Sequence, residues 1–234
     1  MTNEYLDLLA YFGVGGAHPG GFALTQSILK DIKIKPSDHI LDIGCGTGQT
    51  ANFLVNKFSC NVTAIDNHAL MVEKAKERFK HHDSLITVLQ DDAQNLIFQD
   101  DSFEFIIAES VIAFTDISKT LNELFRVLKK GGSLFMIEMT AEQKLPEEIQ
   151  RKACTLYGIK EILSEEQWVF KLKEVGFEQI DILKTPSLLI QTEINDINQS
   201  ADIPMSFYNL WDEHHTFIEE QRNNIGFRAF RCSF

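Results

Sequence analysis

Apolar positions in the first 140 residues follow two alternating patterns. Compact apolar runs have the length of buried strands, and they lie at residues 39–43, 62–66, 86–90, 103–110 and 133–138. The segments between them place apolar residues three and four positions apart, as in Leu121, Leu124, Phe125 and Leu128. Strands that alternate with helices form parallel sheets covered on both faces, so the pattern predicts a doubly wound α/β fold.

Lys129, Lys130 and Gly131 are typical of a helix end, and we expect a helix to stop there. Further along, Ser164 and Gln167 form a capping box that opens a helix ending at Gly176. Strands follow at 178–183 and, by alternation, at 227–232.

A long connection separates the last two predicted strands. It spans about residues 185–225, and connections of this length are usually functional, so we expect it to cap a substrate pocket. Residues 211–220 within it have helical spacing. His214 and His215 are adjacent and point in different directions, so they do not form the i, i+4 pair of a helical metal site. We expect one to pack and the other to lie at the surface, and we predict no metal site.

The first predicted strand runs directly into three glycines at alternate positions, Gly44, Gly46 and Gly48. Glycines let the backbone turn sharply and approach a ligand closely, and the next helix offers unpaired N–H groups. A dinucleotide-binding loop would need glycine where Gln49 stands, and here Asp42 precedes the run by two positions. The loop therefore predicts a nucleoside cofactor site other than the usual dinucleotide type.

Composition narrows the class of protein. The chain has 234 residues, 44% of them hydrophobic, and 34 acidic against 22 basic residues give a net charge of −12. This charge repels polyanions, so neither nucleic acid nor an anionic membrane is the expected partner. The four cysteines are far apart in the sequence, which is typical of free thiols in a reducing compartment. No signal peptide or membrane-length apolar run is present, so we expect a cytoplasmic protein.

The sequence D-x-G-x-G-x-G at 42–48 resembles the first motif of class I, Rossmann-like S-adenosyl-L-methionine (SAM)-dependent methyltransferases. Residues 36–183 follow the same family, which implies a seven-stranded, mostly parallel sheet with an antiparallel seventh strand between strands five and six. The resemblance divides one domain, 1–234, into an N-terminal lid with a helix, a core, a cap insertion and a last strand, at residues 1–35, 36–183, 184–225 and 226–234.

The resemblance also implies which residues hold the cofactor. The methionine end would lie against the glycine loop, at Asp42, Gly44, Cys45 and Gly46. Asp66 would accept hydrogen bonds from the ribose hydroxyls and Asn67 would lie beside the adenine. Asp92 with Ala93 would read the adenine amino group, with Asp91 a near alternative.

Two residues are candidates for the chemistry. Glu109 ends the fourth predicted strand, and it would accept from the cofactor's ammonium or help to deprotonate a substrate, or simply be solvated. His18 lies in the glycine-rich run 13–21, which we expect to act as a lid, and it would serve as general base or substrate contact. The alternative is a tight turn in which His18 only caps backbone groups.

Several substrate classes fit poorly. The segment after Glu109 lacks the Asn/Asp-Pro-Pro-aromatic run of base-amino methyltransferases, no cysteine follows a proline, and an acidic metal cluster is missing. What remains is a small-molecule methyltransferase resembling the group that includes quinone-biosynthesis C-methyltransferases. An aromatic lid is expected from Tyr11, Phe12, Phe114, Tyr157, Phe207, Tyr208 and Trp211. A SAM-binding protein without transferase activity and an NAD(P)-dependent oxidoreductase are the alternatives, and a homodimer is left open.

Overall fold

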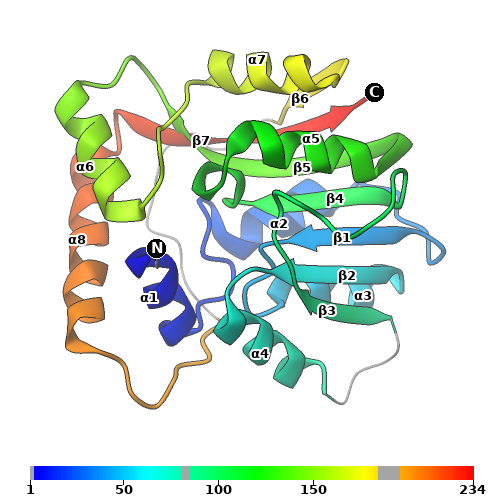
Figure 1. Ribbon diagram of the computed structural model, residues 1–234, viewed down its shortest axis with the longest axis horizontal. Helices are drawn as coiled ribbons and strands as arrows, with labels where there is room; N and C mark the ends of the chain where they lie inside the picture. Colours follow the sequence, from blue (N-terminus) through cyan, green and yellow to red (C-terminus); the bar gives the residue numbers. More distant parts are fainter. Residues whose placement is uncertain (1–2, 81–84, 184–195) are drawn as a thin grey trace.

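The computed structural model describes residues 3–80, 85–183 and 196–234, and its centre is a seven-stranded sheet (Figure 1). The strands are β1 (His39–Ile43), β2 (Asn61–Asp66), β3 (Ile86–Gln90), β4 (Phe103–Glu109), β5 (Leu128–Ala141), β6 (Gln179–Ile182) and β7 (Ile225–Ser233). They are ordered β3-β2-β1-β4-β5-β7-β6. Only β7 is antiparallel to its neighbours, β5 and β6, which confirms the predicted fold class and the place of the last strand.

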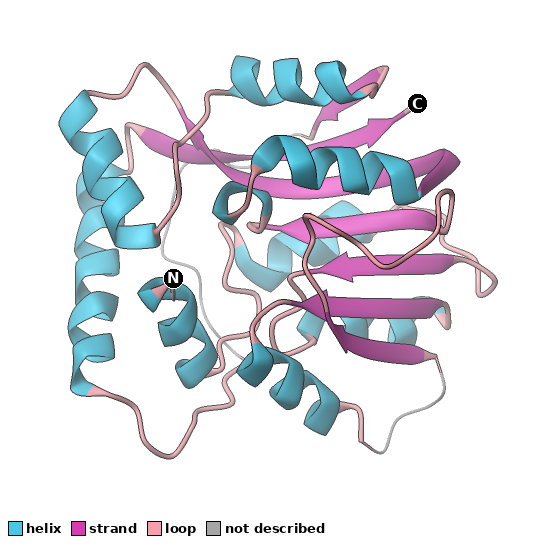
Figure 2. Ribbon diagram, in the orientation of Figure 1, coloured by secondary structure: helices cyan, strands magenta, loops and turns pink. Residues whose placement is uncertain are grey.

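Helices cover both faces of this sheet (Figure 2). They are α1 (Glu4–Phe12), α2 (Gly21–Leu29), α3 (Gln49–Phe58), α4 (Ala69–Arg78), α5 (Ile117–Val127), α6 (Glu147–Tyr157), α7 (Glu165–Val175) and α8 (Met205–Gln221), with one 3₁₀ turn, η1 (Ile112–Phe114). The central strand β1 is buried along nearly its whole length, as expected for a strand between two helical layers.

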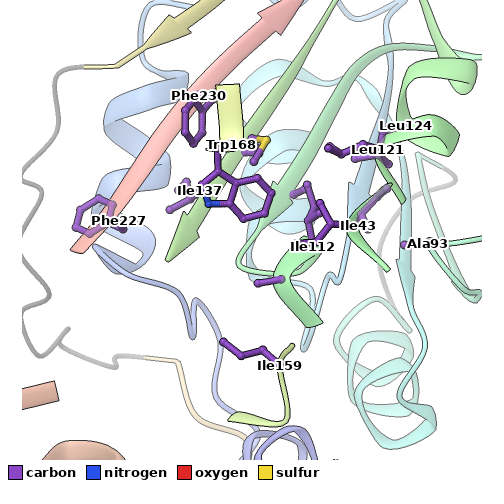
Figure 3. Close-up of a cluster of buried hydrophobic side chains, with 14 of the residues drawn as sticks. Ile43, Ala93, Ile112, Leu121, Leu124, Ile137, Ile159, Trp168, Phe227 and Phe230 are labelled. Carbon is purple, nitrogen blue, oxygen red and sulfur yellow. The ribbon is translucent and has the colours of Figure 1, made fainter. Parts of the chain in front are cut away.

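Two apolar clusters fill the space between helices and sheet. The smaller packs α2 and α3 against β1 and β2, through residues such as Leu29, Leu54 and Ile40. The larger packs α5 and α7 on the other face, and its members include Leu121, Leu124 and Trp168 (Figure 3). The capping box that opens α7 is present in full, so this prediction is confirmed.

The helix end predicted at Gly131 is wrong by several residues. Helix α5 stops at Val127, and Leu128 already has extended dihedral angles and pairs with Phe103. Pairing with β4 therefore overrides the local signal of the two lysines, and Gly131, at φ 75°, lies inside β5 instead of ending a helix.

Helices α1, α6 and α8 stand together beside the carboxyl ends of the parallel strands (Figure 1). Helix α8 begins six residues earlier than the predicted 211–220 and belongs to the expected cap insertion, of which residues 184–195 lie outside the described part of the chain. Among the described residues, no helix has both the length and the apolar composition needed to cross a membrane.

Candidate functional site

Strand order reverses between β1 and β4, and the loop after β1 lies at this point. Ligands of open α/β sheets bind where the carboxyl ends of the strands diverge in this way. Gly44, Gly46 and Gly48 have φ angles of 65°, 53° and 83°, which L side chains rarely adopt. A Cβ on Gly44 would lie 2.3 Å from Val111 Cγ2, whereas one on Gly46 would meet nothing closer than Met71 Sδ at 4.0 Å. Gly46 therefore presents bare backbone to open space.

That space is a cavity of ≈ 150 Å³ at the ends of β1 to β4, which we call the strand-edge cavity. Eight predicted site residues line it: His18, Gly44, Gly46, Asp66, Asn67, Asp92, Ala93 and Glu109. Asp91 lines it as well, so the structure keeps both acids at the end of β3 as candidates. The topology therefore brings most of the predicted set together from separate loops.

Asp66 links the strand-edge cavity to the glycine loop. Its Oδ2 accepts a hydrogen bond from the Gly46 amide at 3.0 Å, and its Oδ1 accepts from the His68 amide at 2.8 Å. Burial raises the pKa of this carboxyl, and the two amide donors oppose that shift. Each carboxylate oxygen keeps a second lone pair, so Asp66 has capacity for ligand hydroxyls.

Asp42 and Cys45 lie behind the cavity wall instead of lining it. Asp42 is 2% exposed and its Oδ2 has no hydrogen-bond partner among the described residues. Burial and the nearby Glu109 charge raise the pKa of Asp42 well above its usual value. The side chain of Cys45 packs into the smaller apolar cluster. Asp42 thus keeps an unsatisfied acceptor in the protein interior, and the Cys45 amide donates to the Ile65 carbonyl at 2.9 Å.

Glu109 is held by two threonines. Thr50 donates to Oε2 at 2.7 Å, and Thr25 donates to Oε1. His18 Nε2 lies 3.6 Å from the same Oε1 and 3.2 Å from Thr25 Oγ1, while His18 Nδ1 lies 3.1 Å from the Pro19 carbonyl. Because a carbonyl only accepts, Nδ1 carries a hydrogen. The structure therefore joins both predicted catalytic residues in one network and also gives His18 a contact that caps the backbone.

A second cavity, of ≈ 280 Å³, adjoins the first among α1, α6 and α8, and we call it the helical chamber. Leu6, Leu9, His18, Ser110 and Phe114 line both cavities. Of the predicted aromatic lid, only Phe114, Tyr157 and Trp211 line the chamber. The other four rings pack outside its lining, as where Phe12 stacks on Trp211 with centroids 5.5 Å apart.

The expected split of the histidine pair into one packed and one surface residue is wrong. His214 and His215 are both half-buried and both line the helical chamber. His215 turns its Nδ1 back to the Trp211 carbonyl at 2.8 Å, which satisfies that nitrogen within α8. His214 meets tyrosine hydroxyls from α1 and α6, contacts that sequence spacing alone does not reveal.

Two further residues near the cavities were not expected from the sequence. His68 follows Asn67, lines the strand-edge cavity and has a buried Nδ1 without a partner among the described residues. Glu138 is fully buried in β5 and accepts hydrogen bonds from the amides of Val111, Ile112 and Ala113, so it holds the loop after β4. The sequence did contain a signal for Glu138, because an acidic residue within the apolar run 133–138 indicates a buried, hydrogen-bonded carboxyl group.

Arg78 ties the cap to the glycine loop. It donates to the Thr47 carbonyl at 2.6 Å and pairs with Asp196 at 2.6 Å. The Asp196 backbone in turn accepts from the Gly15 amide at 2.9 Å. The run 13–21 is thus tied to the cap insertion, and several of its residues line both cavities.

The groups that face the strand-edge cavity fit the cofactor predicted from the glycine loop. The bare backbone of Gly46 and the free lone pairs of Asp66 match the close approach and the hydroxyls of an adenosyl amino acid, and the Glu109 carboxylate lines the same cavity. Within the described residues, no group of three or more His, Cys, Asp or Glu side chains is arranged to hold a metal ion.

Comparisons with known proteins agree with this geometry. Residues 40–132 match the model of a methyltransferase domain. An uncharacterized methyltransferase, YodH, of Bacillus subtilis (strain 168) is 31% identical over 229 residues, which cover 97% of this chain and 98% of YodH. A ubiquinone/menaquinone biosynthesis C-methyltransferase of Zymomonas mobilis is 37% identical over 111 residues, 47% of this chain and 46% of that protein.

Among solved structures, Haemonchus contortus phosphoethanolamine N-methyltransferase 2 in complex with SAM superposes with a TM-score of 0.75 at 21% identity, covering 97% of this chain and 56% of that one. At this identity the likeness concerns the fold. Sheet order, glycine loop and full-length sequence similarity together show that this chain belongs to the class I SAM-dependent methyltransferases, enzymes whose cofactor is S-adenosyl-L-methionine.

Proposed function

We propose that this enzyme transfers the methyl group of SAM to a small-molecule acceptor held in the helical chamber. The observation that carries the proposal is the shared wall of the two cavities, where Ser110, Phe114 and His18 line both. A cofactor in one cavity and an acceptor in the other would meet at this wall. Methyl transfer needs such an arrangement, because its main requirement is alignment of the reacting atoms.

The chamber wall indicates the kind of acceptor. Leu6, Leu9, Met139 and Ile218 supply apolar surface, and Phe114 and Trp211 add aromatic faces. Such a lining favours an apolar or aromatic body over a charged polymer. The net charge of −12 also disfavours nucleic acid. By their names, the quinone-pathway and phosphoethanolamine relatives act on small molecules, which agrees with this proposal.

The residues of the strand-edge cavity would divide the work of holding the cofactor. Gly44 and Gly46 would give backbone contacts to its methionine end, and Asp66 would bind its ribose hydroxyls. Asn67 would lie beside the adenine, with Asp92 and Ala93 at its amino edge. When bound, SAM supplies an activated methyl group on its sulfonium, so no covalent enzyme group is needed.

Glu109 and His18 would act at the wall between the two cavities. The threonine contacts fix the Glu109 carboxylate, which leaves its remaining lone pairs for the cofactor's ammonium. His18 is 5% exposed and lies beside both cavities, where it would contact the acceptor or take its proton. The run 13–21 that carries it would exclude water from the reacting atoms.

Calorimetric titration with SAM, S-adenosylhomocysteine and NAD, followed by methyl transfer from labelled SAM to an acceptor panel, tests this function. Micromolar binding of the two SAM-type ligands without a response to NAD, and label in a small acceptor, is the expected result. SAM binding without label in any acceptor would favour a binding protein without transferase activity. A response to NAD alone would refute the cofactor assignment.

A further inference from the structure

Three polar rings meet in the helical chamber, and none of them lines the strand-edge cavity. Tyr5 comes from α1, Tyr157 from α6 and His214 from α8, and all three line the chamber. Both tyrosine hydroxyls approach the same nitrogen, His214 Nδ1, at 3.1 Å for Tyr157 and 3.5 Å for Tyr5. The tyrosine rings meet edge to face, with centroids 4.9 Å apart at 82°, so the hydroxyls converge on the histidine.

The hydrogens in this cluster have one favoured arrangement. Burial, with His215 nearby, lowers the pKa of His214 to about 4, so its ring is neutral at neutral pH. Burial raises the pKa of both Tyr5 and Tyr157, so their hydroxyls keep their hydrogens. A phenol is the better donor and an imidazole nitrogen the better acceptor, so a tyrosine donates to Nδ1 and the ring hydrogen lies on Nε2.

Two donors in the cluster then have no acceptor. A neutral imidazole offers one lone pair at Nδ1, so it accepts from one tyrosine and leaves the hydrogen of the other available. His214 Nε2 likewise has no hydrogen-bond partner among the described residues, because both hydrogen bonds to this ring go to Nδ1. Donors in a partly dry chamber favour a ligand that brings an acceptor oxygen.

The charges around the chamber agree with an oxygen and not with an ammonium group. Among the described residues, its only lining side chains with a permanent charge are Glu219 and Arg222, which are exposed and opposite in sign. Neither belongs to the tyrosine–histidine cluster. Phe114 stacks parallel to Tyr5, with centroids 6.3 Å apart, and Trp211 tilts against His214, so aromatic faces border the donors.

We propose that Tyr5, Tyr157 and His214 form a subsite that binds the oxygen of a phenol-type acceptor, with the ring of the acceptor against the apolar wall of the chamber. This inference rests on the proposed function and narrows its substrate class to aromatic compounds that carry a hydroxyl or carbonyl oxygen. Cationic amines are disfavoured, because the subsite contains donors and no carboxylate.

Three small probes test the subsite: p-cresol, toluene, which lacks the hydroxyl, and benzylamine, which carries a cation. Each is titrated into the protein saturated with S-adenosylhomocysteine, and binding is followed by calorimetry and NMR. We expect p-cresol to bind about tenfold more tightly than toluene, the gain of one well-made hydrogen bond. Benzylamine is expected to bind no better than toluene.

Substitutions in the tyrosine–histidine cluster test whether it causes the preference for p-cresol over toluene. Tyr157→Phe and His214→Leu should reduce the preference for p-cresol over toluene to less than about threefold. Tyr208→Phe, on the outer part of α8 at 43% exposure, makes the same change in a tyrosine outside the chamber lining and should keep the preference. Affinity for S-adenosylhomocysteine should stay at the wild-type value in all three variants, which also shows that they are folded.

Equal affinities for p-cresol and toluene, or tighter binding of benzylamine, would overturn the subsite while leaving a small-molecule chamber intact. Failure of all three probes to bind a protein that does bind S-adenosylhomocysteine would overturn the subsite and the small-molecule function together. As a check independent of ligands, nitrogen-15 spectra should show His214 protonated at Nε2 at pH 7. Protonation at Nδ1 would contradict the donor arrangement.

Discussion

Gly46→Ala, compared with a control glycine, separates the conformational cost of a side chain at the glycine loop from its effect on cofactor affinity. Gly46 has a φ of 53°, and a Cβ there meets only Met71 Sδ at 4.0 Å. The added methyl therefore clashes with nothing in the protein but points into space that the cofactor should fill. Gly131 offers a matched control, since its φ is 75° and a Cβ there meets nothing within 4 Å.

Both substitutions should cost a similar amount of stability. A non-glycine residue in the left-handed region costs about 1 to 2 kcal/mol, and each kcal/mol lowers Tm by about 2 to 4 °C in a protein of this size. Binding should distinguish them. Overpacking by one methyl costs about 1 to 3 kcal/mol, so Gly46→Ala should weaken the binding of S-adenosylhomocysteine by about 5-fold to 150-fold. Gly131→Ala should leave this affinity unchanged.

Thermal unfolding of both variants measures the change in Tm, and calorimetric titration measures the change in affinity for S-adenosylhomocysteine. Gly46→Val extends the series, because its branched side chain should remove measurable binding altogether. Wild-type affinity in Gly46→Ala would refute the placement of the cofactor against this loop. An equal loss of affinity in Gly131→Ala would show that strain, and not occupied space, explains the effect.

Three further predictions address individual side chains. Asp66→Ala should weaken SAM binding by about 1 to 3 kcal/mol in calorimetry, because the Gly46 amide and the ribose hydroxyls that Asp66 would bind lose their acceptor, and unchanged affinity would exclude Asp66 from the site. His18→Ala should lower kcat with nearly unchanged SAM affinity, and an equal fall in both would assign His18 to the structure of the lid. Burial raises the pKa of Glu138 to about 7, above its unfolded value, so its contribution to stability is present at low pH and lost as pH rises from about 4.5 to 7. Glu138→Gln should therefore gain about 3 kcal/mol relative to wild type over that interval in urea unfolding, and a pH-independent difference would contradict the buried, protonated state.

The sheet, and the convergence of the candidate cofactor residues on one cavity, were predictable because their signals are local. The glycine run, Asp66 and Asp92 each follow an apolar strand, and parallel strands bring their carboxyl ends to one edge. The wrong helix end near Gly131 shows the limit of such signals. There the pairing of Leu128 with Phe103, 25 residues away, decides where the strand begins.

The arrangement of the helical chamber could not be predicted, because it depends on contacts between residues far apart in the sequence. Tyr5 and His214 are 209 residues apart, and Tyr157 reaches the same histidine from a third helix. Helical spacing over 211–220 predicted a helix that carries His214 but left its partners unspecified. His68 was not singled out for another reason, since its buried and unpaired ring nitrogen is recognised only once the burial of the described residues is known.

The wall between the two cavities has a thermodynamic consequence. Leu6, Leu9 and Val14 contact both spaces, so a ligand that orders this segment from one side has already met part of the entropic cost of binding on the other. Such coupling is reciprocal: any affinity that SAM adds for the acceptor, the acceptor adds equally for SAM. Under the proposed function, methyl transfer would remove the sulfonium charge of the cofactor on one side of this wall and enlarge the acceptor on the other, so both ligands that share the wall would change in the same step.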